Sequence, residues 1–483
     1  MALNEKTWAR LARKFLTSGV DSGLDDVSLA QVCDRLIRRE TEVSSARAVT
    51  LARKFVERTR PRKGVLLTTA YRNLGWACLV SGDFKEAEKN YLKAREMLQR
   101  QAEMRGRVDR ILIDVYMYLS DFAEARRRAR LAMAVFKRLG NEAEAAKTRV
   151  NYANLLHRQD RHREAGRLYE QAAEFFEKQN NPLAAAFCNY NRANTLVQLF
   201  NFDRAEQLYK ESRKVFQRYG HNLRATGCLN GLAWLHMLEG NYHIALKELA
   251  RCEQDYRKAA QPRELILCRL DRAESYLGLN LYVDALEAAR EADKAAVKLG
   301  IRYEASKAAF FTAKAAVALG KIKEARRALK RARTGFKAEN NRSFLAAVNL
   351  LSVQLEVTSS RKPAAIKAAR RTFSQAQLPL WEAICDLQLL SAQPAATSVL
   401  RRLKRNPAVK AVPHLYARHH TMLGDREAER GRMAEARRHW QQAADVLDAV
   451  RAKLPPVDLR SAFSRHQSDP YRKLISAELD RDP

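Results

Sequence analysis

Cysteines are the residues of this sequence that most directly suggest chemistry. Cys188, Cys228 and Cys268 recur at one fixed interval, and thiolates are common zinc ligands. Zinc sites take pairs of cysteines with roughly two to four residues between them, and none of the seven cysteines has such a neighbour. The same column is continued by Thr148, Ala308 and Val348. It therefore predicts a slot for small buried side chains rather than a metal or redox centre.

Histidines cluster near the C-terminus of the sequence: His414, His419, His420 and His439. His419 and His420 are adjacent, so on a helix their side chains point about 100° apart. A zinc site needs convergent ligands. We therefore interpret these histidines as solvated or half-buried, and we expect neither a metal site nor a cofactor.

Motifs for phosphate binding and nucleophilic catalysis are missing from the sequence. Leu319-Gly320-Lys321 resembles the end of a phosphate-binding loop, but it lacks the earlier glycine, the following hydroxyl residue and the preceding strand. There is no glycine-rich dinucleotide motif and no serine elbow. Because no nucleophile stands beside a base, we expect the protein not to be an enzyme.

The elements that would position any site are predicted by a column of alanines with the same period. It consists of Ala125, Ala165, Ala205, Ala245, Ala285, Ala325 and Ala365. Further small or apolar residues follow four and seven positions later, on the same helix face, and they let a neighbouring helix approach closely. A fixed period of this length with two amphipathic helices per period predicts an all-α, right-handed α-solenoid of about nine to ten helix pairs.

This pattern resembles the tetratricopeptide repeat (TPR), in the long version of kinesin-light-chain-like arrays. The best match runs from Tyr71-Arg72-Asn73-Leu74-Gly75 through Gly82 and Ala87 to Tyr91 and Ala94. The resemblance spans about residues 66–447. It implies a scaffold or adaptor that binds a protein partner, since such arrays are seldom catalysts.

The domain organisation follows from where the period holds. We expect an N-terminal helical cap over residues 1–65, a regular array over 66–376, a shortened pair and a final unit over 377–453, and a tail over 454–483 formed by one helix or partly disordered.

The resemblance also implies a site. In such arrays the first helix of each repeat lines a concave groove, and asparagines there hold the backbone of an extended peptide. The matching residues are Asn73, Asn151, Asn154, Asn191, Asn194 and Asn230. Flanking cations would favour an acidic ligand: Arg72, Arg110, Lys147 and Arg158. The alternative is that these asparagines bridge neighbouring helices, and the sequence does not choose between the two. Beyond Asn230 the pattern changes, so we expect the groove within residues 69–240.

Charge suggests a second hypothesis. The chain has 88 Lys and Arg against 55 Asp and Glu, a net charge of +33. Residues 321–410 alone hold 19 basic and 5 acidic residues. Basic runs on the second helices predict an outer stripe: Arg126, Arg127, Arg130, Arg326, Arg327, Lys330, Arg370, Arg371, Arg401 and Arg402. Aromatic residues are not interleaved with them, so the alternative function is a nucleic-acid-associated factor that contacts phosphates only.

The tail has a resemblance of its own. Val457-Asp458-Leu459-Arg460-Ser461-Ala462-Phe463, followed by Pro470-Tyr471-Arg472-Lys473-Leu474-Ile475, is similar to the connector that precedes CHAT peptidase domains. It implies a regulatory partner of a separate CHAT-type protease.

Cellular location is predicted from what the sequence lacks. No apolar run approaches the roughly 18 residues that cross a bilayer, and Met1-Ala2-Leu3-Asn4 does not begin a signal peptide. An odd number of cysteines without paired spacing fits a reducing compartment. We therefore expect a cytoplasmic protein without membrane contact.

Overall fold

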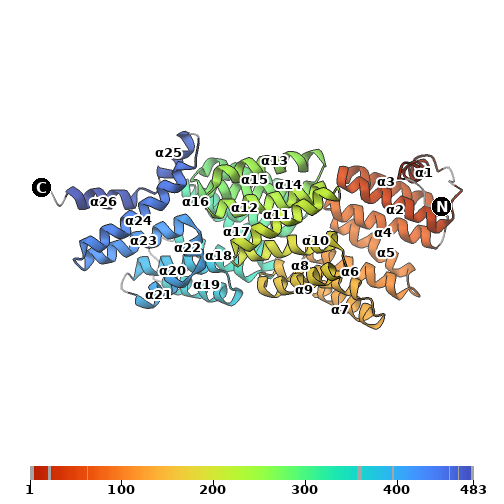
Figure 1. The fold of residues 1–483 in the computed structure, drawn as a ribbon, viewed down its shortest axis with the longest axis horizontal. Coiled ribbons are helices and arrows are strands. Elements are labelled where there is room, and N and C mark those ends of the chain that lie inside the picture. The colour runs from red at the N-terminus through yellow and green to blue at the C-terminus, as the bar shows by residue number, and fades with distance from the viewer. Residues whose placement is uncertain are drawn as a thin grey trace.

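The computed structural model describes residues 5–19, 23–62, 64–355, 362–393, 396–455, 457–465 and 467–479. Within these residues the chain forms 26 α-helices and no strand. Consecutive helices pack in antiparallel pairs along an elongated body with the N-terminus at one end and the C-terminus at the other (Figure 1). The prediction of an all-α solenoid of TPR-like pairs is confirmed.

The helices fall into three groups. The N-terminal group is α1 (Glu5–Ser18), α2 (Asp26–Val43) and α3 (Ser45–Thr59). The array comprises α4 (Val65–Ser81), α5 (Phe84–Met97), α6 (Ala102–Tyr118), α7 (Phe122–Arg138), α8 (Glu142–Arg158), α9 (His162–Lys178), α10 (Pro182–Gln198), α11 (Phe202–Arg218), α12 (Asn222–Leu238), α13 (Tyr242–Lys258), α14 (Pro262–Gly278), α15 (Tyr282–Leu299), α16 (Arg302–Ala318), α17 (Ile322–Ala338), α18 (Arg342–Gln354) and α19 (Lys362–Ala376). The C-terminal group is α20 (Pro379–Ala392), α21 (Thr397–Arg405), α22 (Pro407–Ala411), α23 (Pro413–Glu429), α24 (Met433–Ala452), α25 (Val457–Arg465) and α26 (Asp469–Leu479).

A regular rhythm of turns sets the lengths of the array helices. From Ser120 to Asn340 a residue with positive φ follows each helix end, twice in every period of the alanine column, and seven of these twelve residues are not glycine. Such a left-handed residue ends a helix by directing N–H groups back to its last carbonyls. Because the helices between these turns are nearly equal in length, the pairs stack with nearly constant geometry.

Small side chains sit where neighbouring helices come closest. Six members of the alanine column, from Ala125 to Ala325, are completely buried, whereas Ala365 on α19 is half-buried. Glycines play the same part elsewhere: a Cβ atom on Gly231 of α12 would lie 2.5 Å from the ring of Tyr209 on α11. The spacing of small residues therefore produces close helix packing, as expected.

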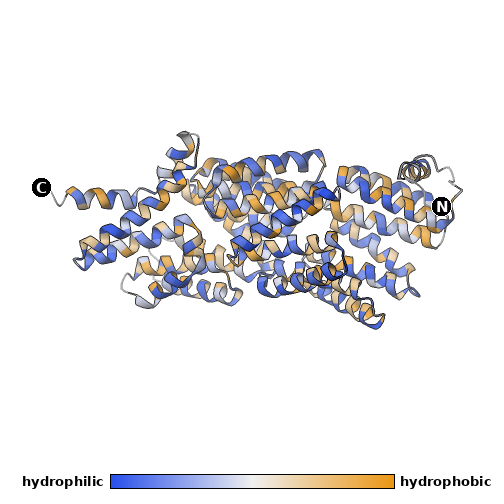
Figure 2. Ribbon diagram, viewed as in Figure 1, coloured by the Kyte–Doolittle hydropathy of each residue, from blue (hydrophilic) through white to orange (hydrophobic). Residues whose placement is uncertain are grey.

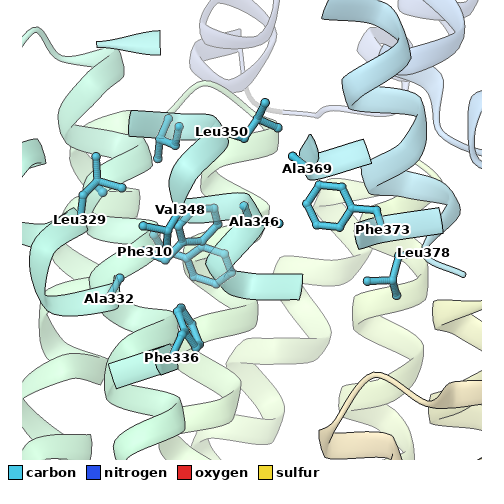
Figure 3. Packing of buried hydrophobic residues seen from close by; sticks show 14 of the residues in the cluster. Phe310, Leu329, Ala332, Phe336, Ala346, Val348, Leu350, Ala369, Phe373 and Leu378 are labelled. Atoms are coloured by element: carbon cyan, nitrogen blue, oxygen red, sulfur yellow. The ribbon is translucent and has the colours of Figure 1, made fainter. Parts of the chain in front are cut away.

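Larger apolar residues fill the space between the pairs. Phe310, Phe336 and Val348, from three successive helices, point into one cluster (Figure 3), and the rings of Phe336 and Phe344 stack with centroids 4.6 Å apart. Hydrophilic and hydrophobic residues alternate along almost every helix (Figure 2). Each helix therefore buries one face and exposes the other.

The solenoid coils so tightly that it touches itself. Gln261 at the start of α14 donates a hydrogen bond to the carbonyl of Thr41 on α2 at 2.9 Å, 220 residues away. Ser120 after α6 bonds to Glu339 after α17, 219 residues away, and Gly82 lies against Leu299. Contacts at this separation join helices that are between five and six repeats apart. The coil therefore closes, where the sequence predicted an open groove.

The tail departs from the expectation of one helix or partial disorder. It forms two helices, α25 and α26. Phe463 on α25 is buried against Tyr242, and its carbonyl accepts a hydrogen bond from Asn280 Nδ2 at 3.3 Å. Tyr471 on α26 donates to Asp448 on α24 at 2.9 Å. Because these side chains find partners on the solenoid, the tail is ordered against it.

Candidate functional site: a polar ladder inside the coil

Closure of the coil encloses a cavity of about 800 Å³. Its wall is formed largely by the first helices of the pairs, with side chains from every even-numbered helix between α4 and α16. Even-numbered helices face inward because the odd-numbered helices cover them from outside. Polar and aromatic side chains dominate the lining, which is the usual character of a site that orients a ligand.

Most of the predicted groove residues reach this cavity. Asparagines on three successive inner helices line it: Asn151, Asn154, Asn191, Asn194 and Asn230. The same holds for Arg110, Lys147 and Arg158. Asn73 and Arg72 on α4 are not part of the lining, and Asn73 is buried with its amide bonded to the Thr69 carbonyl at 3.0 Å. Helix α4 therefore contributes Trp76 to the cavity instead of an asparagine.

One end of the asparagine series is anchored by a carboxylate. Asp114 on α6 accepts hydrogen bonds from Asn151 Nδ2 at 2.6 Å and from Asn154 Nδ2 at 3.2 Å. The Oδ1 atom of Asn154 accepts in turn from the Tyr169 hydroxyl at 2.7 Å and from Asn191 Nδ2 at 3.4 Å. Three inner helices, α6, α8 and α10, are thereby joined through one asparagine.

The other end has the same construction. Asn230 Nδ2 on α12 donates to Asp271 on α14 at 2.6 Å, and Trp234 Nε1 donates to Glu274 at 3.3 Å. Between the two ends, Asn194 accepts from the Tyr209 hydroxyl at 2.6 Å. We call this set the inner ladder: Asp114, Asn151, Asn154, Asn191, Asn194, Asn230, Trp234, Asp271 and Glu274.

Sequence reasoning missed the acidic ends of the inner ladder, although the repeat period marks them. Asp114, Asn154, Asn194, Trp234 and Glu274 form one column with the same period as the alanines. The bonds from Asn154 to Asp114 and from Trp234 to Glu274 each span one period. Reading that column across all repeats, and not the asparagines alone, would have identified the ends.

Electrostatics inside the coil differ from the expectation of a basic groove. Arg110 and Lys147 both pair with the buried carboxylate of Glu144, at 3.3 and 2.9 Å. Arg158 pairs with Glu304 at 3.2 Å. The lining contains six Lys and Arg and seven Asp and Glu. The predicted flanking cations are therefore already neutralised by the protein, although the whole chain carries +33.

Two carboxylates of the inner ladder have no cation at salt-bridge distance among the described residues, Asp114 and Asp271. Burial raises the pKa of each to about 6, against lowering by the asparagine hydrogen bonds and the nearest cations. Near neutral pH both are thus mainly ionised, and the cavity presents negative charge.

Histidines form two close pairs. His157 Nδ1 lies 3.1 Å from His162 Nδ1, and His420 Nδ1 lies 3.1 Å from His439 Nδ1. Burial lowers the pKa of His157 and His420 to about 4, which keeps these rings neutral. In the part of the chain that the structure describes, no group of three potential ligands is placed to hold a metal ion. Cys188, Cys228 and Cys268 are buried and unpaired, as the small-residue column predicted.

On the outer surface, three residues of the predicted basic stripe are bound within the protein. Arg127 pairs with Glu124 at 2.6 Å, and Arg370 and Arg402 share the buried carboxylate of Asp386, at 2.8 and 2.7 Å. The remaining members are exposed: Arg126, Arg130, Arg326, Arg327, Lys330, Arg371 and Arg401. Among the described helices none is both long and apolar enough to cross a membrane.

Paired helices in sequential repeats, coiled around an inner cavity, define a TPR-like α-solenoid. Residues 106–178 match the family model described as "Tetratricopeptide repeat", so the chain carries TPR repeats in this part. A comparison with curated proteins finds no match.

Solved structures of similar proteins include three regulators. A Rap protein complexed with Competence and Sporulation Factor is similar over 80% of this chain and 99% of that chain, at 11% identity and a TM-score of 0.54. Aspartyl phosphate phosphatase F from Bacillus subtilis is similar over 78% and 92%, at 11% identity and a TM-score of 0.42. NprR in complex with its cognate peptide NprX is similar over 64% and 93%, at 13% identity and a TM-score of 0.44. At 11% identity the likeness to the Rap protein concerns the fold alone.

Proposed function

We propose that this protein is a non-catalytic scaffold that binds an extended segment of a protein or peptide partner along the inner ladder. The observation that carries the proposal is the unbroken series of amide and carboxylate side chains on five successive inner helices, all facing one cavity. An extended chain presents alternating donors and acceptors, and asparagine offers both.

Helix bridging does not exhaust the hydrogen-bonding capacity of the inner ladder. Asn151 uses one of its two N–H groups on Asp114, which leaves a donor and an acceptor for a ligand. The Oδ1 atom of Asn230 is buried and has no hydrogen-bond partner among the described residues. Because unpaired buried polar atoms are costly, a ligand N–H at this oxygen would stabilise the complex. Bridging and ligand binding are therefore compatible.

The charges favour a neutral or basic ligand over an acidic one. Asp114 and Asp271 carry only amide hydrogen bonds, whereas the nearby arginines are paired with glutamates. A cationic group on the ligand would supply the missing counter-charge. The Rap protein with the similar fold was solved with its Competence and Sporulation Factor bound; the proposal for this chain rests on its own cavity.

Fluorescence anisotropy with three labelled random peptide pools of about seven residues, basic, neutral and acidic, tests this function. Asn151→Ala with Asn154→Ala should weaken binding of the preferred pool at least about tenfold. Asn189→Ala is the matched control, because Asn189 lies on the inner helix α10 but bonds to Glu177 outside the cavity. It should change affinity less than about twofold.

Asn191→Ala guards against a purely structural effect of the double substitution, since it removes only the 3.4 Å bond to Asn154. It should also weaken binding, with an unchanged melting temperature. Equal affinity of the wild type and all three variants, or no binding of any pool, contradicts the proposal.

Three finer points belong to the same proposal. The length of the repeat period supports the long, kinesin-light-chain-like version of the repeat. Seven buried, unpaired cysteines support a cytoplasmic location. A separate CHAT-type protease would dock on the tail through faces that the solenoid leaves open, such as Ile475 and Leu479, which are 60% and 67% exposed. The side chains of Val457 and Asp458, part of the connector resemblance, lie outside the described residues.

A further inference from the structure

The outer helices α17, α19 and α21 carry exposed cations on one face each. On α17 they follow Lys323 at spacings of three, four, seven and fourteen residues, which is a single helix face. We call the set the outer basic surface: Lys323, Arg326, Arg327, Lys330, Lys337, Lys367, Arg371, Arg401, Lys404 and Arg405. None of the ten has a salt bridge to a described residue, and all side chains are exposed.

The acidic residues of the same region do not offset this charge. Glu324 bonds to Arg290 of α15, and Glu339 is buried beside Arg158. Asp386 and Glu382 on α20 are held by Arg370, and Asp386 also by Arg402. Every acidic residue between 321 and 411 that the structure describes is thus engaged. This is a physical distinction from the outer helices α9, α11 and α15, which expose several carboxylates.

Internal ion pairs also place the three helices together. Asp386 receives Arg370 from α19 and Arg402 from α21, so these helices flank α20 (Figure 1). Arg371 and Arg401, each next to one of the bound arginines, point outward and are exposed. The buried pairs therefore act as a foundation that holds the exposed cations on one broad face.

The kind of partner follows from what this face lacks. Protein interfaces are anchored by apolar and aromatic side chains, and Ile322 is the one large apolar residue exposed among the described residues of 321–411. Phe336 and Phe373 are buried, and Trp381 lines the inner cavity. Without exposed aromatic rings the face cannot stack unpaired bases. Clustered Lys and Arg alone suit the regularly spaced phosphates of a duplex.

We propose that the outer basic surface binds the phosphate backbone of double-stranded nucleic acid without reading its sequence. This site is separate from the inner ladder, so the same molecule can hold a peptide inside the coil and a duplex outside it. Each phosphate contact releases condensed counterions, which makes the affinity depend steeply on salt.

Anisotropy titrations with a labelled random-sequence DNA duplex of about 20 base pairs, from low to moderate salt, test the proposal. The variant carries Arg326→Gln, Arg327→Gln, Lys330→Gln and Arg371→Gln. The control removes the same charge from exposed cations of α9 and α11: Arg163→Gln, Arg204→Gln, Lys214→Gln and Arg218→Gln. The variant should bind at least about tenfold more weakly at low salt, with a log–log salt slope smaller by up to about 3–4. The control should change affinity less than about threefold.

Three results would overturn the proposal. Equal losses in variant and control would mean that only net charge matters. No duplex binding by the wild type would remove the site. Tighter binding of a poly-glutamate peptide than of the duplex would assign the surface to an acidic protein. The Asn151→Ala, Asn154→Ala protein should bind duplex like the wild type, so failure of the peptide function and failure of this surface are distinguishable.

Discussion

Arg158 on α8 and Glu304 on α16 form a buried ion pair of 3.2 Å across 146 residues of sequence. The side chains are 8% and 2% exposed. Glu339 lies 3.9 Å from the same guanidinium, which also covers the ring of Tyr303 at 4.4 Å from its centroid. One arginine therefore neutralises two buried carboxylates where two turns of the coil meet.

Arg158→Ala should lower the free energy of unfolding by about 3–5 kcal/mol, because it leaves Glu304 and Glu339 buried without their counter-charge. Arg161→Ala is the control, since its pair with Glu164 is exposed, and it should cost less than about 1 kcal/mol. Urea titrations followed by circular dichroism measure both. Similar midpoints for the two variants would show that the seam contributes little to stability.

Closure of the coil could not be predicted from the sequence, whereas the helix pairs could. Ala125 and its column specify close packing of neighbouring helices because that contact recurs once in every repeat. The contact of Gln261 with Thr41 depends on small rotations accumulated over more than five repeats, and no local pattern encodes their sum. An error of a few degrees per repeat would separate those residues.

The candidate site shows the same division. The asparagines on α8, α10 and α12 were found because they match a repeat position, and the structure places them on the cavity wall. Arg110 and Arg158 were expected to attract an acidic ligand. Their neutralisation by Glu144 and Glu304 depends on contacts between helices and between turns, which the local sequence around each arginine does not reveal.

Asp271→Asn should change stability in a pH-dependent way. The pKa of Asp271 is raised to about 6 from a usual value of 3.8, so the folded state holds an extra proton between about pH 4 and 6. Stability of the wild type from this group therefore falls as pH rises through that window. Asparagine does not titrate and can still accept the bond from Asn230. The variant's relative stability should increase by about 1–3 kcal/mol between pH 4 and 7.

Urea unfolding of both proteins across this range measures the difference, and the titrations of His157 and the other groups common to both largely cancel. A difference that stays constant, or that shrinks as pH rises, would contradict the raised pKa.

Ala260→Gly should stabilise the protein. Ala260 has a φ of 49° in the turn before α14, a left-handed conformation that costs an L-residue about 1–2 kcal/mol. Glycine removes that cost but loses more entropy on folding, so the net gain is about 0.5–1 kcal/mol. Ala205→Gly, within α11 and fully buried, should destabilise by about 1 kcal/mol or more. Thermal melts of both variants should shift in opposite directions, and a shared direction would refute the backbone argument.

Gly231→Ala should weaken both stability and ligand binding. The new Cβ atom would lie 2.5 Å from the ring of Tyr209, which is completely buried and has no room to retreat. Overpacking of this kind costs about 1–3 kcal/mol. Because the Tyr209 hydroxyl holds Asn194 at 2.6 Å, a displaced ring would also release the middle of the inner ladder.

Gly166→Ala on α9 provides the comparison, since its Cβ atom would meet only the Thr195 hydroxyl, at 3.2 Å. It should change stability by about 1 kcal/mol or less and leave affinity for the preferred peptide pool intact. Melting temperature and peptide anisotropy on the two variants separate the effects. If Gly231→Ala lowers the melting temperature but binds the peptide pool like the wild type, then Tyr209 supports the fold and does not position Asn194 for the ligand.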